Sequence, residues 1–368
     1  GGGGGAGGGG GGGGDCRLFF VDVGFEGALQ AVPASMLSPR HSEPRLETIA
    51  QLRELTRRSL EKLDVYYHHM VRAAHEAATT SKILEALGDD EVLVVADWKM
   101  KFLMSLFREA MSEFFGKRGM PWHGCMLVRK PLRFERDKHG YKEGEFVCEY
   151  KHQMMQGSKE DGFATLSAIV VALTEYKQEN AHIVCATVKT DGAAAYAGST
   201  FTLGLSFMQE LSGGIRVDRH FIGESGQNKS TLDGEFAVAA NQLRRIICSG
   251  GHDVRTADDL FKGLKKVLGA GRTVALFQPG DAATFEAKTV ERLSLMSDRQ
   301  YEYEADGIFT ALVLRRQSFL GDGDRIESSE LFPKGRSAPA APTVIATSSA
   351  AANAATAAAA AAAAPTDP

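Results

Sequence analysis

The two ends of this chain are low-complexity sequence, and this limits how much of it can build a folded core. Residues 1–14 are glycine except for one alanine, so they bury no side chain and lose the most backbone entropy on ordering. Residues 337–368 are almost all Ala, Pro, Ser and Thr. About 320 residues lie between the ends, which is enough for one large domain or for a medium domain with a helical appendage.

The overall charge and the cysteines narrow the class of protein. The net charge is −4 and the pI is about 6.2, unlike a strongly basic nucleic-acid binder but compatible with a local basic groove. The five cysteines have no CxxC spacing, which favours a reduced intracellular protein without structural zinc; a nuclear location is also an expectation. No run of 18 strongly apolar residues occurs, so neither a membrane span nor a membrane partner is expected. Because the chain does not begin with methionine, a fragment of a longer product is also an expectation.

The segment 42–90 is predicted to be helical. Ser42 can cap a first turn that has Pro44 near its start. Apolar residues then recur at spacings of three and four as far as Leu87, and Gly88 ends the pattern. We expect these helices to bind a partner or to form a homo-oligomer.

The region that follows alternates strand and helix patterns. Strand patterns at 91–103, 123–130 and 145–155 precede a helix, a strand, a helix, a strand and a final helix that ends near residue 248. This order predicts an α/β fold with a mixed sheet, in which a three-strand antiparallel meander is followed by αβαβα. A dinucleotide-binding fold is disfavoured because there are not six repeated βα units.

These patterns divide the chain into five expected parts. They are a Gly-rich tail and linker (1–41), a helical segment (42–90), a catalytic-type domain (91–265), a C-terminal extension of that domain (266–332) and a disordered Ala/Pro-rich tail (333–368). Two further strand patterns, at 273–279 and 307–316, fall in the extension.

Three acidic residues stand at the ends of elements in this pattern. Asp97 ends the apolar run of the first strand, Asp191 ends the fourth strand, and Asp233 lies in the first turn of the helix after the fifth strand. In an α/β sheet the strand ends and helix starts meet at one rim, where sites are built. The three carboxylates are therefore expected to share a pocket, although each alone is also typical of a turn or a helix start.

Such a carboxylate cluster predicts a bound cation. Mutual repulsion among the three acids is costly unless a cation lies among them, and hard oxygen ligands suit Mg²⁺ or Mn²⁺. Glu235 is an alternative third acid, but it lies about 200° around the helix from Asp233, so both cannot point into one site. Asp233 is preferred.

Nearby basic and polar residues are candidates for contacts with nucleic-acid phosphates. They are Lys99 on the first strand, His220 on the fifth strand and Lys229 just before Asp233. Each also has an ordinary interpretation, as a solvated strand lysine, a strand histidine and a first-turn lysine.

Residues 223–230, GESGQNKS, resemble a phosphate-binding loop and offer a different interpretation. The pattern GxxxxGK[ST] places the phosphates against backbone amides, and here Asn228 replaces its last glycine. The segment falls late in the chain, and no clear second acidic strand follows it. A P-loop-like NTPase is therefore kept as a lesser alternative.

With these residues in place, the chain resembles an RNase H-like DDE transposase-derived protein. Three stretches carry the resemblance: VVADWKMKF with Asp97, VKTDGAAAY with Asp191, and ESGQNKSTLDGEF with Asp233. The block from Asp191 through SGGHDVRTADDLFKGL is further similar to transposon-related proteins of algae and other eukaryotes. The resemblance covers roughly residues 91–265 and implies an RNase H-like sheet.

The resemblance also implies a function. It implies metal-dependent cleavage or strand transfer on DNA, with Asp97, Asp191 and Asp233 as catalytic residues that hold Mg²⁺ or Mn²⁺. A metal-activated water, and then a DNA 3′-hydroxyl, would attack the phosphodiester. The alternative is a domesticated protein that keeps the fold and binds a partner or DNA without chemistry.

Overall fold

The computed structural model describes residues 42–157, 159–223, 231–280, 300–306, 308–316 and 318–349. The chain divides into two compact units, residues 1–67 and residues 68–368. Within the described ranges, no helix is both long enough and apolar enough to cross a membrane.

The first described element is a long helix, α2 (Ser42–Ala86). Its last turn belongs to the second unit, where Ile83 is buried together with Leu87 just beyond the helix end. The expected helical segment continued to residue 90, but residues 89 and 90 form a turn that leads into the first strand.

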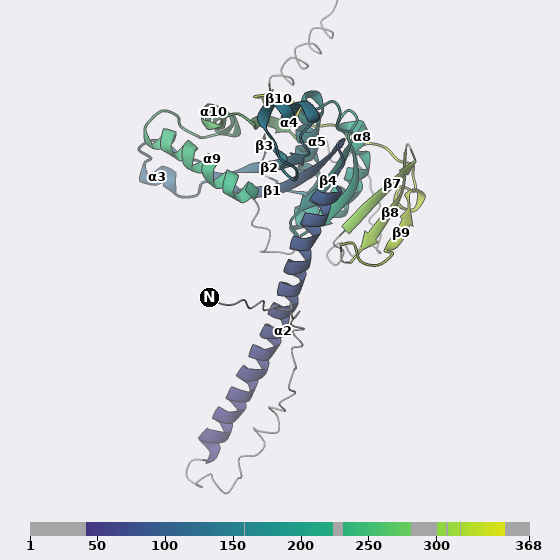
Figure 1. Cartoon of the computed structure of the whole chain (residues 1–368). Helices are drawn as coiled ribbons and strands as arrows, with labels where there is room; N and C mark the ends of the chain where they lie inside the picture. The colour runs from purple at the N-terminus through teal and green to yellow at the C-terminus, as the bar shows by residue number, and fades with distance from the viewer. Residues whose placement is uncertain are drawn as a thin grey trace, which may run out of the picture. The chain divides into compact units, whose positions relative to one another are not determined.

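The second unit is built on a ten-stranded mixed sheet in the order β10-β6-β3-β2-β1-β4-β5-β7-β8-β9 (Figure 1). β1 pairs antiparallel with β2 and β2 with β3, whereas β1 and β4, and β4 and β5, are parallel neighbours. The strands are β1 (Glu91–Leu103), β2 (Gly119–Arg129), β3 (Val147–Met155), β4 (Cys185–Thr190), β5 (Arg216–Ile222), β6 (Arg272–Gln278), β7 (Gln300–Asp306), β8 (Ile308–Arg315), β9 (Asp324–Glu327) and β10 (Thr343–Thr347). The class is therefore α/β, as the sequence predicts.

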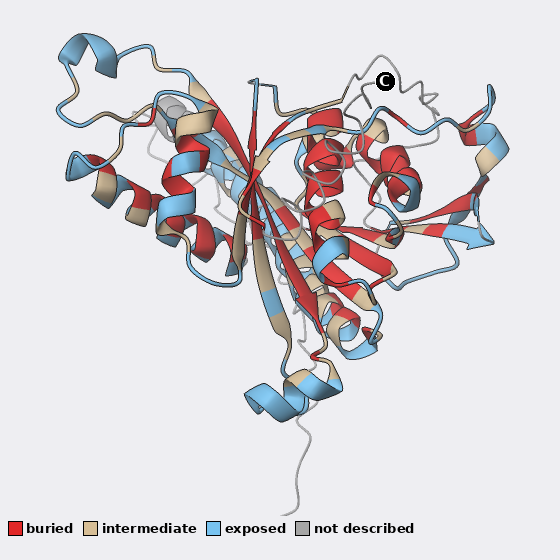
Figure 2. Cartoon of the chain, turned by 90° about the horizontal axis from the view of Figure 1, so that it is seen from above, coloured by how far each residue is buried: buried red, intermediate tan, exposed pale blue. Residues whose placement is uncertain are grey.

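Helices cover both faces of the sheet. The longer ones are α5 (Gly162–Glu179), α9 (Thr231–Cys248) and α10 (Ala257–Val267); the shorter ones are α3 (Met111–Phe114), α4 (Arg133–His139), α6 (Ala194–Ala197), α7 (Ser199–Gly204), η2 (Leu205–Phe207), α8 (Met208–Leu211) and α11 (Ser328–Leu331). Alternation along β1 places Val92 and Val94 in the core shared with α5, and Leu93 in the core shared with α9 and α10. Buried residues accordingly fill the central strands (Figure 2).

The structure differs from the sequence expectations in its connections and at its C-terminal end. The connection between β2 and β3 of the expected meander contains helix α4, and Glu135 holds the start of this helix by pairing with Arg129 and accepting from the Leu132 amide. The region expected to be a disordered tail from residue 333 contains β10, which pairs with β6 at one edge of the sheet. This short strand contains an apolar Val-Ile pair within the Ala-rich sequence.

Candidate functional site

The strand register brings Asp97 and Asp191 to the same edge of the sheet. Ala96 on β1 pairs with Thr190, the last residue of parallel strand β4. Asp97 follows Ala96 and Asp191 follows Thr190, so the two aspartates lie side by side just beyond this residue pair. Asp97 also shares its strand face with Leu93, which belongs to the core under α9.

Asp233 reaches this edge from α9, and a glycine sets how closely that helix approaches. Gly124 on β2 pairs with Asp97. A Cβ added to Gly124 would lie 2.6 Å from Phe236 Cζ and 3.3 Å from Leu232 Cδ1. Because Gly124 has no side chain, these two residues of α9 rest directly on β2 beside Asp97, and Asp233 lies next to them in the first helical turn.

The three carboxylates influence one another electrostatically. Burial raises the pKa of Asp97, and the negative charges of Asp191 and Asp233 raise it further, to about 7. Burial likewise raises the pKa of Asp191; a hydrogen bond from the Ala193 amide opposes this rise, and the charge of Asp233 adds to it. Asp97 and Asp191 are half-buried and Asp233 is exposed, so the cluster opens to solvent on the side of α9.

The cluster is wider than a closed single-ion site. Within the described ranges, the set of three possible ligands whose donor atoms all lie within 4.8 Å of one another is elsewhere, at Glu91, Cys185 and Asp218. The charges of Asp191 and Asp233 raise the pKa of Asp97, but the oxygens of the three aspartates do not all lie within 4.8 Å of one another. Such a spread of carboxylates would suit two divalent ions better than one.

Tyr196, which the sequence analysis did not single out, has a buried polar group within electrostatic reach of two of these acids. Its side chain is fully buried, and its hydroxyl has no hydrogen-bond partner. Burial raises the pKa of Tyr196, with further contributions from the charges of Asp97 and Asp191. A buried hydroxyl without a partner is uncommon, and it indicates a place for a water or ligand atom. The only signal in the sequence was an aromatic residue closing the small-residue run after Asp191.

His123 packs in the same region without an exposed edge. Its Nδ1 lies 3.0 Å from Gln153 Oε1, and its ring is 4.8 Å from that of Trp98 and 6.1 Å from that of Tyr196. Burial lowers the pKa of His123 to about 4, so the ring is neutral at physiological pH. It supports the floor of the site by packing.

Glu235 is committed to other partners and does not belong to the cluster. Its carboxylate accepts from Arg272 Nε at 2.7 Å and from Arg272 Nη2 at 2.8 Å, and it lies 3.5 Å from His152 Nε2. Burial raises the pKa of Glu235, but His152 and Arg272 outweigh that effect and hold it at about 2. The choice between the two acids of α9 therefore falls on Asp233.

The structure places the three candidate nucleic-acid contact residues, Lys99, His220 and Lys229, in different situations. Lys99 Nζ lies 5.5 Å from the centre of the Trp122 ring, and burial together with the charge of Arg244 on α9 lowers the pKa of Lys99. His220 is fully buried, so the predicted contact is wrong for this residue. Lys229 and the P-loop-like segment 224–230 lie outside the described residues. Arg244, which the sequence analysis missed, is an exposed base near Lys99.

His220 instead has a structural role behind Asp191. Its Nε2 lies 2.9 Å from Thr190 Oγ1, and its ring stacks on Tyr301 of β7 with the centroids 5.6 Å apart. Burial lowers the pKa of His220 to about 3, so the ring stays neutral. The residue thereby connects the end of β4 to the C-terminal strands.

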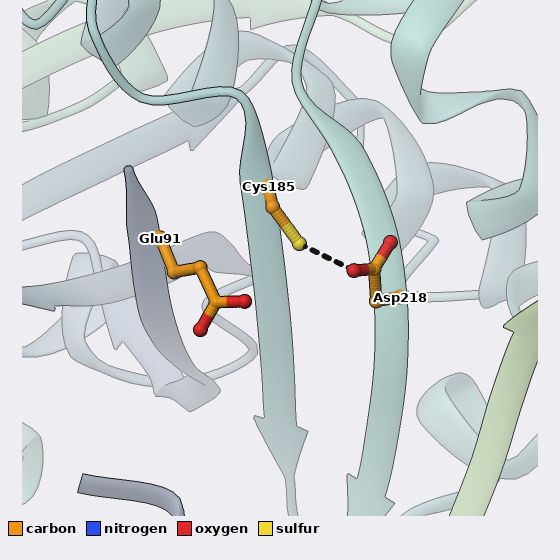
Figure 3. Close-up of side chains that lie close together, drawn as sticks. All are labelled: Glu91, Cys185 and Asp218. Carbon is orange, nitrogen blue, oxygen red and sulfur yellow. Dashed lines mark hydrogen bonds between the residues drawn. The ribbon is translucent and has the colours of Figure 1, made fainter. Parts of the chain in front are cut away.

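The Glu91, Cys185 and Asp218 cluster lies at the opposite ends of the same parallel strands (Figure 3). The Cys185 thiol donates to Asp218 Oδ2 at 2.8 Å, Arg216 Nε donates to Asp218 Oδ1 at 2.8 Å, and the Gly88 amide donates to Glu91 Oε2 at 2.9 Å. Burial and Asp218 raise the pKa of Cys185, which favours the thiol over the thiolate that a metal requires. Each member is thus already paired within the protein.

Comparison with known proteins adds no relative to these observations. No protein-family model matches the chain. No curated protein matches it either.

Proposed function

We propose that this chain cleaves or joins DNA phosphodiesters with the help of divalent metal ions, using Asp97, Asp191 and Asp233. The observation that carries the proposal is the pKa of Asp97, raised to about 7 by burial and by the charges of the other two acids. Three carboxylates from separate elements are held together at a cost in repulsion. Perturbed groups of this kind cluster at functional sites.

The residues present fit Mg²⁺ or Mn²⁺. The donors are carboxylate oxygens, which hard divalent cations prefer. Asp97, Asp191 and Asp233 would hold the metal. When bound, two such ions supply Lewis acidity and an activated water for displacement at phosphorus.

The chain's own residues supply orientation and charge around that position. Asp191 is fixed at the end of β4 by its bond from the Ala193 amide, and Asp233 is fixed by the packing of α9 on Gly124. Lys99 and Arg244 provide positive charge on the α9 side, where they can contact phosphate oxygens on either side of the cleaved bond.

The topology supports an RNase H-like assignment within this proposal. β1, β2 and β3 are consecutive antiparallel neighbours, and β4 and β5 continue the sheet in parallel. The acids fall on the first strand, after the fourth strand and on the helix after the fifth, as the resemblance to DDE transposase-derived proteins implies. A nuclear or intracellular protein that acts on DNA follows from the same proposal.

A non-catalytic descendant of such an enzyme is the second candidate. The carboxylate oxygens do not converge within 4.8 Å, and the net charge is −4. These two observations favour a chain that keeps the fold and binds a partner or DNA without cutting it.

Cleavage and metal binding of the purified full chain separate the two candidates. We expect nicking of a supercoiled plasmid with Mn²⁺ and none with EDTA. Asp97→Asn, Asp191→Asn and Asp233→Asn should each reduce nicking by more than about a hundredfold, since a lost ligand costs at least as much as a lost supporting group.

The matched control is Asp258→Asn. Asp258 is a carboxylate on α10 with an exposed ion pair to Lys262, and its loss should leave nicking unchanged. Calorimetry with Mn²⁺ completes the test. A chain that neither nicks DNA nor binds Mn²⁺ would favour the non-catalytic candidate, and nicking that persists in Asp233→Asn would remove this residue from the site.

A further inference from the structure

The part of α2 in the first unit carries large apolar side chains in solvent. Leu52, Leu55, Leu60, Leu63 and Tyr66, which we call the apolar stripe, are each 56–61% exposed. At 100° per residue they fall within an arc of about 140° around the helix. Five large apolar residues aligned along about 20 Å of helix exceed the scattered exposure that is normal on a protein surface.

The charged residues of the same stretch lie outside the arc of the stripe. Arg57 pairs with Glu54 at 2.7 Å and with Glu61 at 2.5 Å, and Arg58 pairs with Glu54 at 2.6 Å, all on the opposite side of the helix. These i,i+3 and i,i+4 pairs stabilise the helix by itself. The ion pairs therefore do not involve the apolar stripe, which remains accessible for packing against another surface.

The two polar residues inside the arc are compatible with an apolar interface. Thr56 Oγ1 donates to the Leu52 carbonyl and Ser59 Oγ donates to the Leu55 carbonyl, each at 2.8 Å. Because both hydroxyls donate to their own helix, they can be covered without leaving a buried donor unpaired. In a heptad register with Leu52 at d and Leu63 at a, Thr56 and Ser59 occupy the a and d positions between them, and Leu55 and Leu60 flank these at g and e.

We infer that this chain forms a homodimer in which the apolar stripe packs against the stripe of a second copy. The charged face argues for a second copy over a membrane surface. Between residues 52 and 67 it holds four basic and three acidic side chains, whereas membrane-surface helices have polar faces rich in Lys and Arg. Two identical faces of mixed, nearly balanced charge do not repel each other, so self-pairing meets no electrostatic barrier. The inference does not depend on the proposed chemistry at Asp97.

The mass of the full chain in solution tests this inference. The monomer is 39.5 kDa, and sedimentation equilibrium between about 1 and 100 µM should give twice that mass at the upper end. Leu63→Lys places a charge in the middle of the stripe and should weaken dimerisation by at least tenfold. Circular dichroism would verify that the variant retains its helix.

Val65→Lys is the matched control because Val65 is 67% exposed and lies on the face opposite to the stripe. It makes the same change of chemistry and should leave the dimer intact. A monomer throughout the concentration range would overturn the inference, as would a dimer that resists Leu63→Lys. Binding to neutral or anionic vesicles that is lost in Leu63→Lys, with a monomer in solution, would likewise overturn it in favour of a membrane surface.

Discussion

Replacing Asp97 with asparagine should stabilise the metal-free chain, and increasingly so as the pH rises. The pKa of Asp97 is raised from its ordinary 3.8 to about 7 in the folded chain. Between these values the Asp97 carboxyl binds more protons in the folded state than in the unfolded state. The contribution of Asp97 to the free energy of unfolding therefore falls as the pH rises from about 4 to about 7, and is constant above that. Asp97→Asn has no proton to lose and escapes this fall.

The size of the effect follows from the shift. Roughly three pH units correspond to about 4 kcal/mol at 1.36 kcal/mol per unit. Asp97 is only half-buried, so solvent screening reduces the expected gain to about 2 kcal/mol. A gain of this size is large against the total stability of a domain.

Urea unfolding of wild type and Asp97→Asn in EDTA, at several pH values from about 4 to about 8, measures the gain directly. The difference in free energy of unfolding should be small near pH 4, grow through pH 5 and 6, and become constant above about pH 7. Asp258→Asn is the control and should show no such trend. A difference in free energy of unfolding that does not change with pH, or a variant that is less stable than wild type at pH 8, would refute the idea that burial and repulsion raise the pKa of Asp97.

Three other substitutions probe the surroundings of the site. Tyr196→Phe should leave the free energy of unfolding unchanged or raise it by about 1 kcal/mol, since an unpaired buried hydroxyl is removed, while Mn²⁺-dependent nicking falls; a clear loss of stability in urea unfolding would reveal a partner for the hydroxyl. Gly124→Ala should cost about 1–3 kcal/mol because its methyl would meet Phe236, and a full-strength nicking reaction in this variant would contradict the role given to α9 packing. Arg272→Ala should cost about 1–3 kcal/mol, because Arg272 is 34% exposed and Glu235 keeps His152 near its buried carboxylate, and a cost below about 0.5 kcal/mol in the same unfolding assay would count against the pair.

The fold class and the convergence of Asp97 with Asp191 could be predicted because local sequence patterns determine both. Apolar runs that end in an acid indicate buried strands; β1 continues past Asp97 to Leu103, but its parallel pairing with β4 still brings Asp97 level with Asp191 at the end of β4. The choice of Asp233 over Glu235 was favoured by helix geometry but needed the structure, because Arg272 and His152 come from strands far away in the sequence.

Other features depended on contacts that no local pattern carries. His220 looked like a contact residue because strand position alone does not tell a buried histidine from an exposed one. Tyr196 was missed because its significance lies in the lack of a partner for its hydroxyl, which only packing reveals. β10 was missed because its short apolar pair is surrounded by alanine and serine and forms a strand only where β6 offers an open edge.

The contact of His220 with Thr190 on one side and Tyr301 on the other makes the C-terminal strands part of the foundation of the aspartate site. The shortest piece that keeps the site intact therefore extends well beyond residue 265. A chain shortened to residues 91–265 would lack Tyr301 and also β6, which lies next to β3 in the sheet. His220, which contacts Thr190, would lose its stacking partner Tyr301. Strands β3 and β5 would become exposed edge strands, which tend to pair with other chains.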